Sequence, residues 1–107
     1  MIRARFLTDA GRLCGFSVSG HAGFADAGED IVCAAVSSAV QLTANGITEI
    51  LGLAASVEAQ DDTISLRLAP NSQGEGSAEA FLKALRLQLS LLAEDYPQNV
   101  KVTCTEV

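Results

Sequence analysis

The most reactive side chains in the sequence are a histidine and a cysteine that stand close together along the chain. His21 is the only histidine, and Cys33 follows twelve residues later. We expect Cys33 in the first turn of a long helix, where unpaired backbone N–H groups and the helix dipole favour a thiolate. A neighbouring imidazole would strengthen this effect and could carry a proton to a leaving amine. The pair therefore indicates nucleophilic thiol chemistry.

Other interpretations of the same residues remain open on residue type alone. A cysteine in a segment rich in alanine and valine is often a small core residue, and a single histidine in a loop is often exposed and idle. The acidic residues nearby, Asp26, Glu29 and Asp30, would oppose thiolate formation. A metal site built from His21, Cys33 and a carboxylate matches no common zinc spacing and has no evident fourth ligand. We predict neither a metal nor a cofactor.

The elements that would position these residues can be predicted from hydrophobic periodicity. Five segments alternate like strands: residues 2–8, 13–19, 57–60, 64–68 and 100–107. Two segments have helical periodicity: residues 31–51, with Asp30 as N-cap and Gly52 as the end, and residues 79–94, which end before Pro97. Gly46 is a point at which the first helix could bend. The glycine-rich residues 20–30 form a loop that is long for so small a protein, as functional loops often are.

The predicted order of elements is β-β-α-β-β-α-β. This order indicates an α+β two-layer sandwich, in which two helices lie on one face of a mostly antiparallel sheet. A length of 107 residues fits one domain, residues 1–107. The small size and the exposed edges of such a sheet favour a dimer.

Composition narrows the classes of partner and compartment. Thirteen acidic residues stand against seven basic ones, for a formal charge of −6, which argues against direct nucleic-acid binding and fits a basic protein partner or a solvated surface. We find no signal-peptide core and no segment that approaches a membrane span, so we expect no membrane contact. Three widely spaced cysteines indicate a reducing compartment and a cytoplasmic location. We expect Cys14 and Cys104 to be packing residues.

The run GHAGFADAGEDIVCAAVS, residues 20–37, resembles the signature of the ribosomal-processing cysteine protease family. That signature has Gly-His-Ala near the end of a second strand, then Gly-x-Asp-(Ile/Leu)-Val-Cys-Ala and a serine four residues after the cysteine. This sequence matches each part with Gly20-His21-Ala22, with the run from Gly28 to Ala34, and with Ser37. The later run LSLLAEDYPQNVKV is also similar to the family's C-terminal portion. The resemblance covers essentially the whole chain.

The resemblance implies a Cys–His endopeptidase that removes a short N-terminal extension from a large-subunit ribosomal protein in bacteria. Carried onto this chain, it makes Cys33 the nucleophile and His21 the general base and acid. It also implies a homodimer. In the mechanism that we expect, the backbone N–H of Cys33 or Ala34 stabilises the oxyanion, and His21 protonates the departing amine.

Further residues around the pair are expected to support it or to bind substrate: Gly20, Gly23, Asp26, Gly28, Asp30, Ala34 and Ser37. Asp30 would cap the helix and fix the loop, and either Asp26 or Asp30 could orient His21. Ser37 lies one helical turn beyond Cys33 and would either bond near the thiol or bond back to its own helix. The glycines would let the loop change conformation when substrate arrives, which predicts low activity on arbitrary short peptides.

A second hypothesis belongs to a different class of function. The same fold could be a non-catalytic, ribosome-associated module that clasps a peptide in the glycine-rich loop, with Cys33 in the core. Such a module needs neither a thiolate nor His21, so the chemistry of the thiol separates the two hypotheses.

Overall fold

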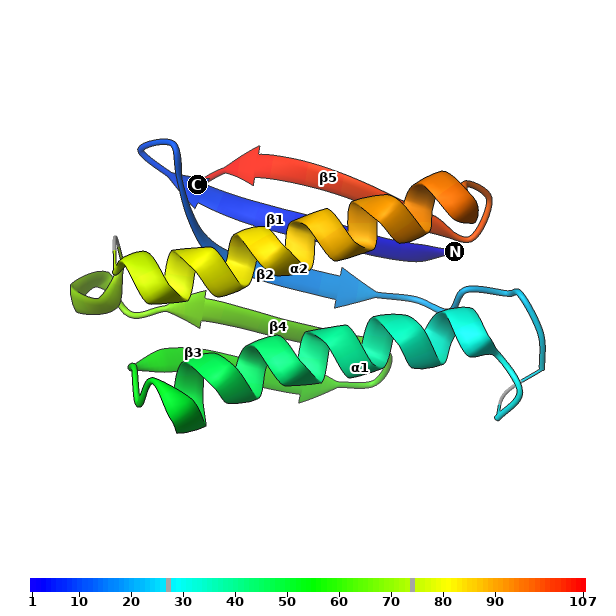
Figure 1. Ribbon diagram of the computed structural model, residues 1–107, viewed down its shortest axis with the longest axis horizontal. Helices are drawn as coiled ribbons and strands as arrows, with labels where there is room; N and C mark the ends of the chain where they lie inside the picture. Colours follow the sequence, from blue (N-terminus) through cyan, green and yellow to red (C-terminus); the bar gives the residue numbers. More distant parts are fainter. Residues whose placement is uncertain (27, 74) are drawn as a thin grey trace.

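The computed structural model describes residues 1–26, 28–73 and 75–107, and its elements follow the predicted order (Figure 1). The strands and long helices are β1 (Ile2–Asp9), β2 (Arg12–Ser19), α1 (Ile31–Asn45), β3 (Ala55–Gln60), β4 (Thr63–Leu68), α2 (Gly76–Asp95) and β5 (Val100–Glu106). Two short helical segments complete the chain: the π-helical turn η1 (Gly46–Ile50) and the 3-10 turn η2 (Pro70–Ser72).

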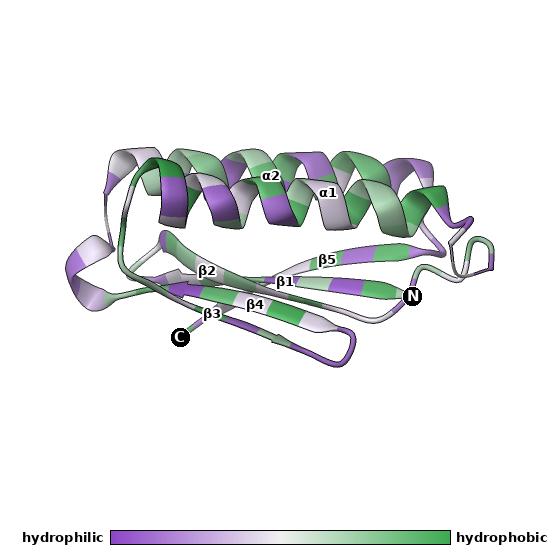
Figure 2. Cartoon of the chain, turned by 90° about the horizontal axis from the view of Figure 1, so that it is seen from below, coloured by the Kyte–Doolittle hydropathy of each residue, from purple (hydrophilic) through white to green (hydrophobic). Residues whose placement is uncertain are grey.

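The five strands form one sheet in the order β3-β4-β2-β1-β5. The pairs β3–β4, β4–β2 and β2–β1 are antiparallel, whereas β1 and β5 run parallel, with Ile2 opposite Val100. Both long helices lie side by side over one face of this sheet (Figure 2). The prediction of an α+β two-layer sandwich with a mostly antiparallel sheet is therefore confirmed.

Strand β1 shows why the sequence pattern specifies a half-buried sheet. Ile2, Ala4 and Phe6 are each at most 3% exposed and face the helices, while Arg3 and Arg5 between them are exposed on the open face. Successive side chains in a strand point to opposite faces, so the alternation fixes which face meets the core. The same core continues through both helices as one contiguous hydrophobic cluster.

Helix α1 buries a stripe of small β-branched residues on the sheet. Val32, Val36 and Val40 recur at four-residue steps and are each at most 3% exposed. At Gly46 the helix widens into the π-helical turn η1, and a Cβ at this position would lie 2.6 Å from the ring of Phe81 in α2. The glycine therefore marks the irregularity that the sequence suggested, and it also lets the two helices approach closely.

The continuous helical run from Ile31 to Ile50 corrects one expectation from sequence. By length and composition alone it could cross a bilayer, with a mean hydropathy of 1.4, so the view that no segment approaches a membrane span was wrong. The reason is that Glu49 is the single charged residue in these twenty positions. In the fold, the apolar stripe of this run packs against the sheet as a core helix.

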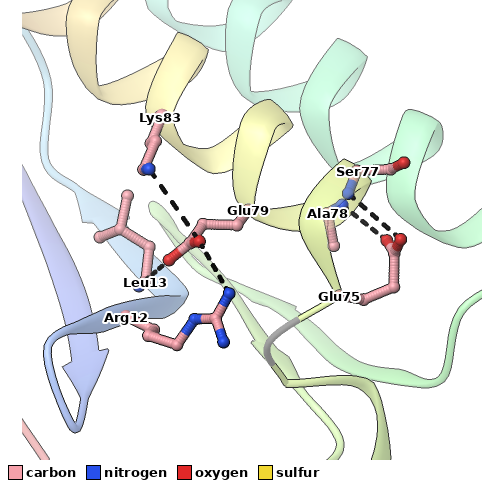
Figure 3. Close-up of polar contacts among 7 residues, drawn as sticks. All are labelled: Arg12, Leu13, Glu75, Ser77, Ala78, Glu79 and Lys83. Atoms are coloured by element: carbon pink, nitrogen blue, oxygen red, sulfur yellow. Dashed lines mark hydrogen bonds and ion pairs between the residues drawn. The ribbon is translucent and has the colours of Figure 1, made fainter.

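Helix α2 begins three residues earlier than the periodicity predicted, at Gly76 rather than Glu79. The cause is an N-cap. The side chain of Glu75 accepts hydrogen bonds from the backbone N–H groups of Ser77 and Ala78, at 3.2 and 2.9 Å (Figure 3). Glutamate is not among the common N-cap residues, so composition gave no signal for this start.

The first turn of α2 is tied to the β1–β2 hairpin by a single carboxylate. Glu79 accepts a hydrogen bond from the backbone N–H of Leu13 at 3.1 Å and lies 3.6 Å from the guanidinium of Arg12 (Figure 3). Lys83, one turn further along the helix, approaches the same carboxylate at 4.0 Å. These contacts fix the end of α2 that lies away from the glycine-rich loop.

Candidate active site

Three connections meet at one end of the molecule: the loop of residues 20–30, the β3–β4 turn and the segment between α2 and β5 (Figure 1). The first turn of α1 opens into the same region and carries Cys33, which is half-buried. The backbone N–H of Ala22 donates a hydrogen bond to the Cys33 Sγ at 3.2 Å. This bond holds the backbone of the loop against the thiol. The loop thus folds back onto the helix start.

Asp30 organises the loop through four backbone hydrogen bonds. Its Oδ1 accepts from the N–H groups of Val32 and Cys33 at 3.0 Å each, which makes it the N-cap of α1. Its Oδ2 accepts from Phe24 and Ala25 at 3.0 and 3.3 Å. These bonds, that from Cys33 foremost, lower the pKa of the Asp30 carboxyl below its usual range. Both oxygens are engaged by the backbone, which leaves Asp30 a poor partner for His21.

The carboxylate nearest to His21 is one that sequence reasoning missed. The His21 Nε2 lies 3.7 Å from the Oδ2 of Asp62 in the β3–β4 turn, and the imidazole is 77% exposed. Within the described residues, neither Asp26 nor Asp30, the carboxylates that could orient His21, forms an ion pair with it. The two partners are forty-one residues apart in the chain, so no local spacing could have indicated the pair; only the order of strands brings them together.

His21 and Cys33 line the same cavity, of about 300 Å³, between α1 and the β3–β4 hairpin. Among the described residues, no hydrogen bond or ion pair joins the two side chains directly. Apolar side chains line much of the cavity: Ile2, Val18, Val36, Val40 and Ile64. Asp61 and Asp62 add carboxylates to its lining. The cavity therefore offers an apolar surface beside a thiol and an imidazole.

A second hollow, of about 510 Å³, adjoins the first and shares His21, Cys33 and Ser37 with it. Gly23, Gly28, Asp30 and Ala34 contribute to its lining. Ser37 is exposed, which disagrees with a buried serine that bonds back to its own helix. Because the two hollows meet at Cys33, an extended chain that crossed both would pass over the thiol.

The amides expected to stabilise an oxyanion are already engaged. The N–H of Cys33 donates to the Asp30 side chain, and the N–H of Ala34 donates to the Asp30 carbonyl oxygen at 3.1 Å. The first belongs to the helix cap and the second is the first hydrogen bond of the helix itself. Either amide would therefore have to leave its present partner before it could bind an oxyanion.

A second contact that sequence reasoning missed holds the loop from the other side. The Nδ2 of Asn99, just before β5, donates a hydrogen bond to the carbonyl oxygen of Ala22 at 2.9 Å, and the Asn99 carbonyl accepts from the N–H of Ile2. Asn99 thus anchors the residue whose own N–H contacts the thiol. It lies in a run that resembles the family, but nothing in its spacing assigned it to this loop.

The remaining candidate residues occupy the loop without such contacts to the thiol. Gly20, Gly23 and Gly28 have positive φ angles of 91°, 68° and 88°. Asp26 is exposed, and its carbonyl oxygen accepts a turn hydrogen bond from the N–H of Glu29 at 2.9 Å. No group of three His, Cys, Asp or Glu side chains placed to hold a metal ion occurs within residues 1–26, 28–73 and 75–107.

A family model described as "Cysteine protease Prp" matches residues 1–101 of the chain. The chain belongs to the Prp family. Among curated proteins, it is 25% identical to the ribosomal processing cysteine protease Prp of Bacillus subtilis (strain 168) over 92 residues, which is 82% of each protein. The resemblance inferred from the GHA and DIVCA motifs is therefore confirmed.

Solved structures share this fold. A protein of Streptococcus mutans matches with a TM-score of 0.87 and 26% identity, over 100% of this chain and 96% of its own. The essential ribosomal processing protease Prp of Staphylococcus aureus, in complex with a covalently linked product peptide, matches with a TM-score of 0.90 and 21% identity. That match covers 98% of this chain and 100% of the S. aureus chain.

Membership of the Prp family makes the chain a cysteine protease and decides against the non-catalytic module. The three cysteines differ sharply as candidates for the nucleophile of a Prp protease. Cys14 is buried, and burial raises the pKa of its thiol. Cys104 is exposed on the edge strand β5, which corrects its expected packing role. Among the described residues, Cys33 is the cysteine that shares a cavity with His21.

Proposed function

We propose that the chain is an endopeptidase that uses Cys33 as nucleophile and His21 as general base and acid to remove an N-terminal extension from a large-subunit ribosomal protein. The observation that carries this proposal is the shared cavity at the start of α1, where the thiol accepts a backbone N–H and faces the same space as the imidazole. The name of the B. subtilis relative, a ribosomal processing protease, supports the choice of substrate.

The reaction follows from these groups. His21 takes the proton from the Cys33 Sγ, and the sulfur forms a bond to the scissile carbonyl carbon. The tetrahedral intermediate then collapses as the C–N bond breaks and His21 gives its proton to the departing amine. Water, deprotonated by His21, attacks the thioester, and the C–S bond breaks to restore the thiol. Cys33 is the leaving group of this second step.

The oxyanion is the former carbonyl oxygen, and the carbon that carries it is bonded directly to the Cys33 Sγ. Because the amides of Cys33 and Ala34 are engaged, the N–H of Ala22 is the better donor: it already approaches the sulfur at 3.2 Å. A shift of this donor from sulfur to oxygen, once the carbonyl carbon is attached, would stabilise charge that develops only in the reaction.

Activation requires a movement of the imidazole. His21 is 77% exposed and has no direct contact with Cys33 among the described residues, so its side chain must turn toward the thiol. The exposed side chain can reach this orientation without substrate, and binding of an extended peptide across both hollows would favour it further. This supports the expectation that arbitrary short peptides are cleaved slowly.

The rest of the proposal concerns location and assembly. The acidic surface suits a basic ribosomal substrate, and the three unpaired cysteines suit the cytoplasm. We also propose a homodimer. The edge strands β3 and β5 and the exposed Leu42, Leu87 and Leu91 on the helices leave surface that a second copy could cover. Sedimentation velocity at micromolar concentration should give twice the monomer mass; a monomer would remove this part.

The central test measures iodoacetamide alkylation of each cysteine by peptide mapping across pH, in the parent and in His21→Ala. Cys104 serves as an internal reference for an exposed thiol and Cys14 for a buried one. We expect Cys33 to react faster than Cys104 at neutral pH in the parent, and the advantage to disappear in His21→Ala. Equal rates in both proteins would contradict an activated thiol.

A second experiment tests the substrate. The parent, Cys33→Ser and Cys104→Ser are each incubated with the host's large-subunit ribosomal protein carrying its N-terminal extension, and the products are weighed by mass spectrometry. We expect a single cut by the parent and by Cys104→Ser, and none by Cys33→Ser. An intact substrate with the parent would overturn the assignment of this target.

A further inference from the structure

We propose that Asp62 is a positioning residue for His21, so that the hydrolytic machinery is a Cys33–His21–Asp62 triad drawn from three separate elements. This rests on the proposed function of Cys33 and His21 and goes beyond it. Nothing in the motif around residues 20–37 contains Asp62; the residue comes from the turn between β3 and β4.

Two contacts hold Asp62 beside His21. The carboxylate Oδ2 lies 3.7 Å from the imidazole Nε2. In addition, the backbone N–H of Gly20, the residue before His21, donates to the carbonyl oxygen of Asp62 at 3.2 Å. The main chains of the two segments are therefore bonded to each other at the point where the side chains meet, so the carboxylate does not reach His21 by chance rotation of a free loop.

The turn that carries Asp62 is tightly specified. Gln60 pairs with Thr63 across the hairpin, which leaves Asp61 and Asp62 as a two-residue turn, and Asp61 takes a φ angle of +55°. Thr63 in turn pairs with Ser19 at the end of β2. The pairing of β4 with β2 thus fixes the position of the turn along the sheet, next to the residues that lead into His21.

The chemistry of the pair depends on which imidazole nitrogen it engages. A carboxylate on the Nε2 side favours the tautomer with the proton on Nε2, which leaves the Nδ1 lone pair to accept the thiol proton. The same carboxylate stabilises the imidazolium that forms after proton transfer, and it limits rotation of the ring. At 3.7 Å the two groups lie within ion-pair distance whenever the imidazole is protonated, and the proposed role requires this separation to shorten to a hydrogen bond as the ring turns toward Cys33.

Asp61 provides a matched control. It has the same charge and the same turn, and it lines the same cavity as Asp62. Among the described residues, the ion pair with His21 involves Asp62 and not Asp61. A general effect of negative charge near the cavity would make the two carboxylates equivalent, whereas positioning of the imidazole requires Asp62 alone.

The experiment compares Asp62→Asn, Asp62→Glu and Asp61→Asn in the full chain, with kcat and KM measured on a peptide that spans the cleaved junction. We expect Asp62→Asn to lower kcat by on the order of 10- to 100-fold while KM and the melting temperature stay near those of the parent. Asp62→Glu should recover part of kcat, whereas any effect of Asp61→Asn, whose carboxylate lines the same cavity, should fall on KM and leave kcat near that of the parent. Alkylation of Cys33 by iodoacetamide should slow in Asp62→Asn alone.

Two results would overturn the inference while leaving the proposed function intact. One is a kcat of Asp62→Asn equal to that of Asp61→Asn when His21→Ala is inactive. The other is a rise in KM with unchanged kcat, which would make Asp62 a substrate-binding residue instead. Cleavage that persists in Cys33→Ser would overturn the proposed function and, with it, the role of Asp62.

Discussion

Replacement of Gly20 by alanine should lower both the stability of the fold and the rate of substrate cleavage. Gly20 joins the end of β2 to His21, and its φ angle is +91°. A Cβ added there would lie 2.4 Å from the carbonyl oxygen of Met1. Two costs follow: an L-residue in a left-handed conformation, and a clash between two backbone segments.

The size of each cost can be worked out from these values. The left-handed conformation costs an alanine about 1–2 kcal/mol, and the clash adds roughly 1–3 kcal/mol as in overpacked cores. Ordinary contact begins at 3.4 Å, so the Cβ and the Met1 oxygen must separate by 1.0 Å, the difference between 3.4 and 2.4. A 1 Å misplacement of a catalytic group costs about 100-fold in rate, so we expect kcat/KM to fall by roughly that factor in a protein that still folds.

The assay pairs thermal unfolding with cleavage kinetics, and Gly11→Ala is the control. Gly11 lies in the β1–β2 turn with a φ angle of +79°, and a Cβ there meets nothing within 4 Å. Gly11→Ala should therefore lose only the conformational cost of about 1–2 kcal/mol and keep its activity. If Gly20→Ala were no less stable than Gly11→Ala, or cleaved its substrate within threefold of the parent rate, the reasoning from the Met1 contact would be refuted.

Three further predictions concern residues around and behind the loop. Backbone hydrogen bonds depress the pKa of Asp30, so its carboxylate stabilises the folded state above the unfolded pKa, and this contribution is lost as pH falls below about 4. The urea midpoint of the parent should therefore drop more steeply on acidification than that of Asp30→Asn. Parallel curves for the two proteins would contradict this. Asn99→Ala removes the donor to the Ala22 carbonyl, so it should cost about 0.5–1.5 kcal/mol and slow Cys33 alkylation, whereas Gln98→Ala should do neither. Gly46→Ala should destabilise the fold by roughly 1–3 kcal/mol because its Cβ meets the Phe81 ring at 2.6 Å. Thermal unfolding of the double variant Gly46→Ala/Phe81→Leu should show a smaller added loss beyond that of Phe81→Leu alone. If Gly46→Ala cost the same stability with and without the Phe81 ring, this contact would be excluded as the cause.

The sequence predicted the elements well where the signal is local. The alternation of Ile2, Ala4 and Phe6 with two arginines indicates a strand without knowledge of its neighbours, and Asp30 before an apolar run indicates a helix start. The start of α2 was missed because its cap is a glutamate, Glu75, whose side chain rarely serves this purpose. Local signals therefore set the order of elements and most of their bounds.

The candidate site was predicted only in part, for the same physical reason. His21 and Cys33 lie near each other in sequence. One loop connects them, and Asp30, the N-cap of α1, holds that loop against the start of the helix. Asp62 and Asn99 reach that loop through strand pairings, those of β2 with β4 and of β1 with β5. Pairing between distant strands depends on the whole core rather than on local pattern, so it could not be derived from spacing.

The parallel pairing of β1 with β5 has a consequence for how the protein folds while it is being synthesised. Strand β1 finds its neighbour β5 only when residues 100–106 have been synthesised, and Asn99, just before β5, is the residue that anchors Ala22. Chains on the ribosome emerge from their N-terminus. The Asn99 anchor of the loop that carries His21 therefore forms only after residue 99 has emerged, so a shorter nascent chain lacks the contact that holds Ala22 from the β5 side.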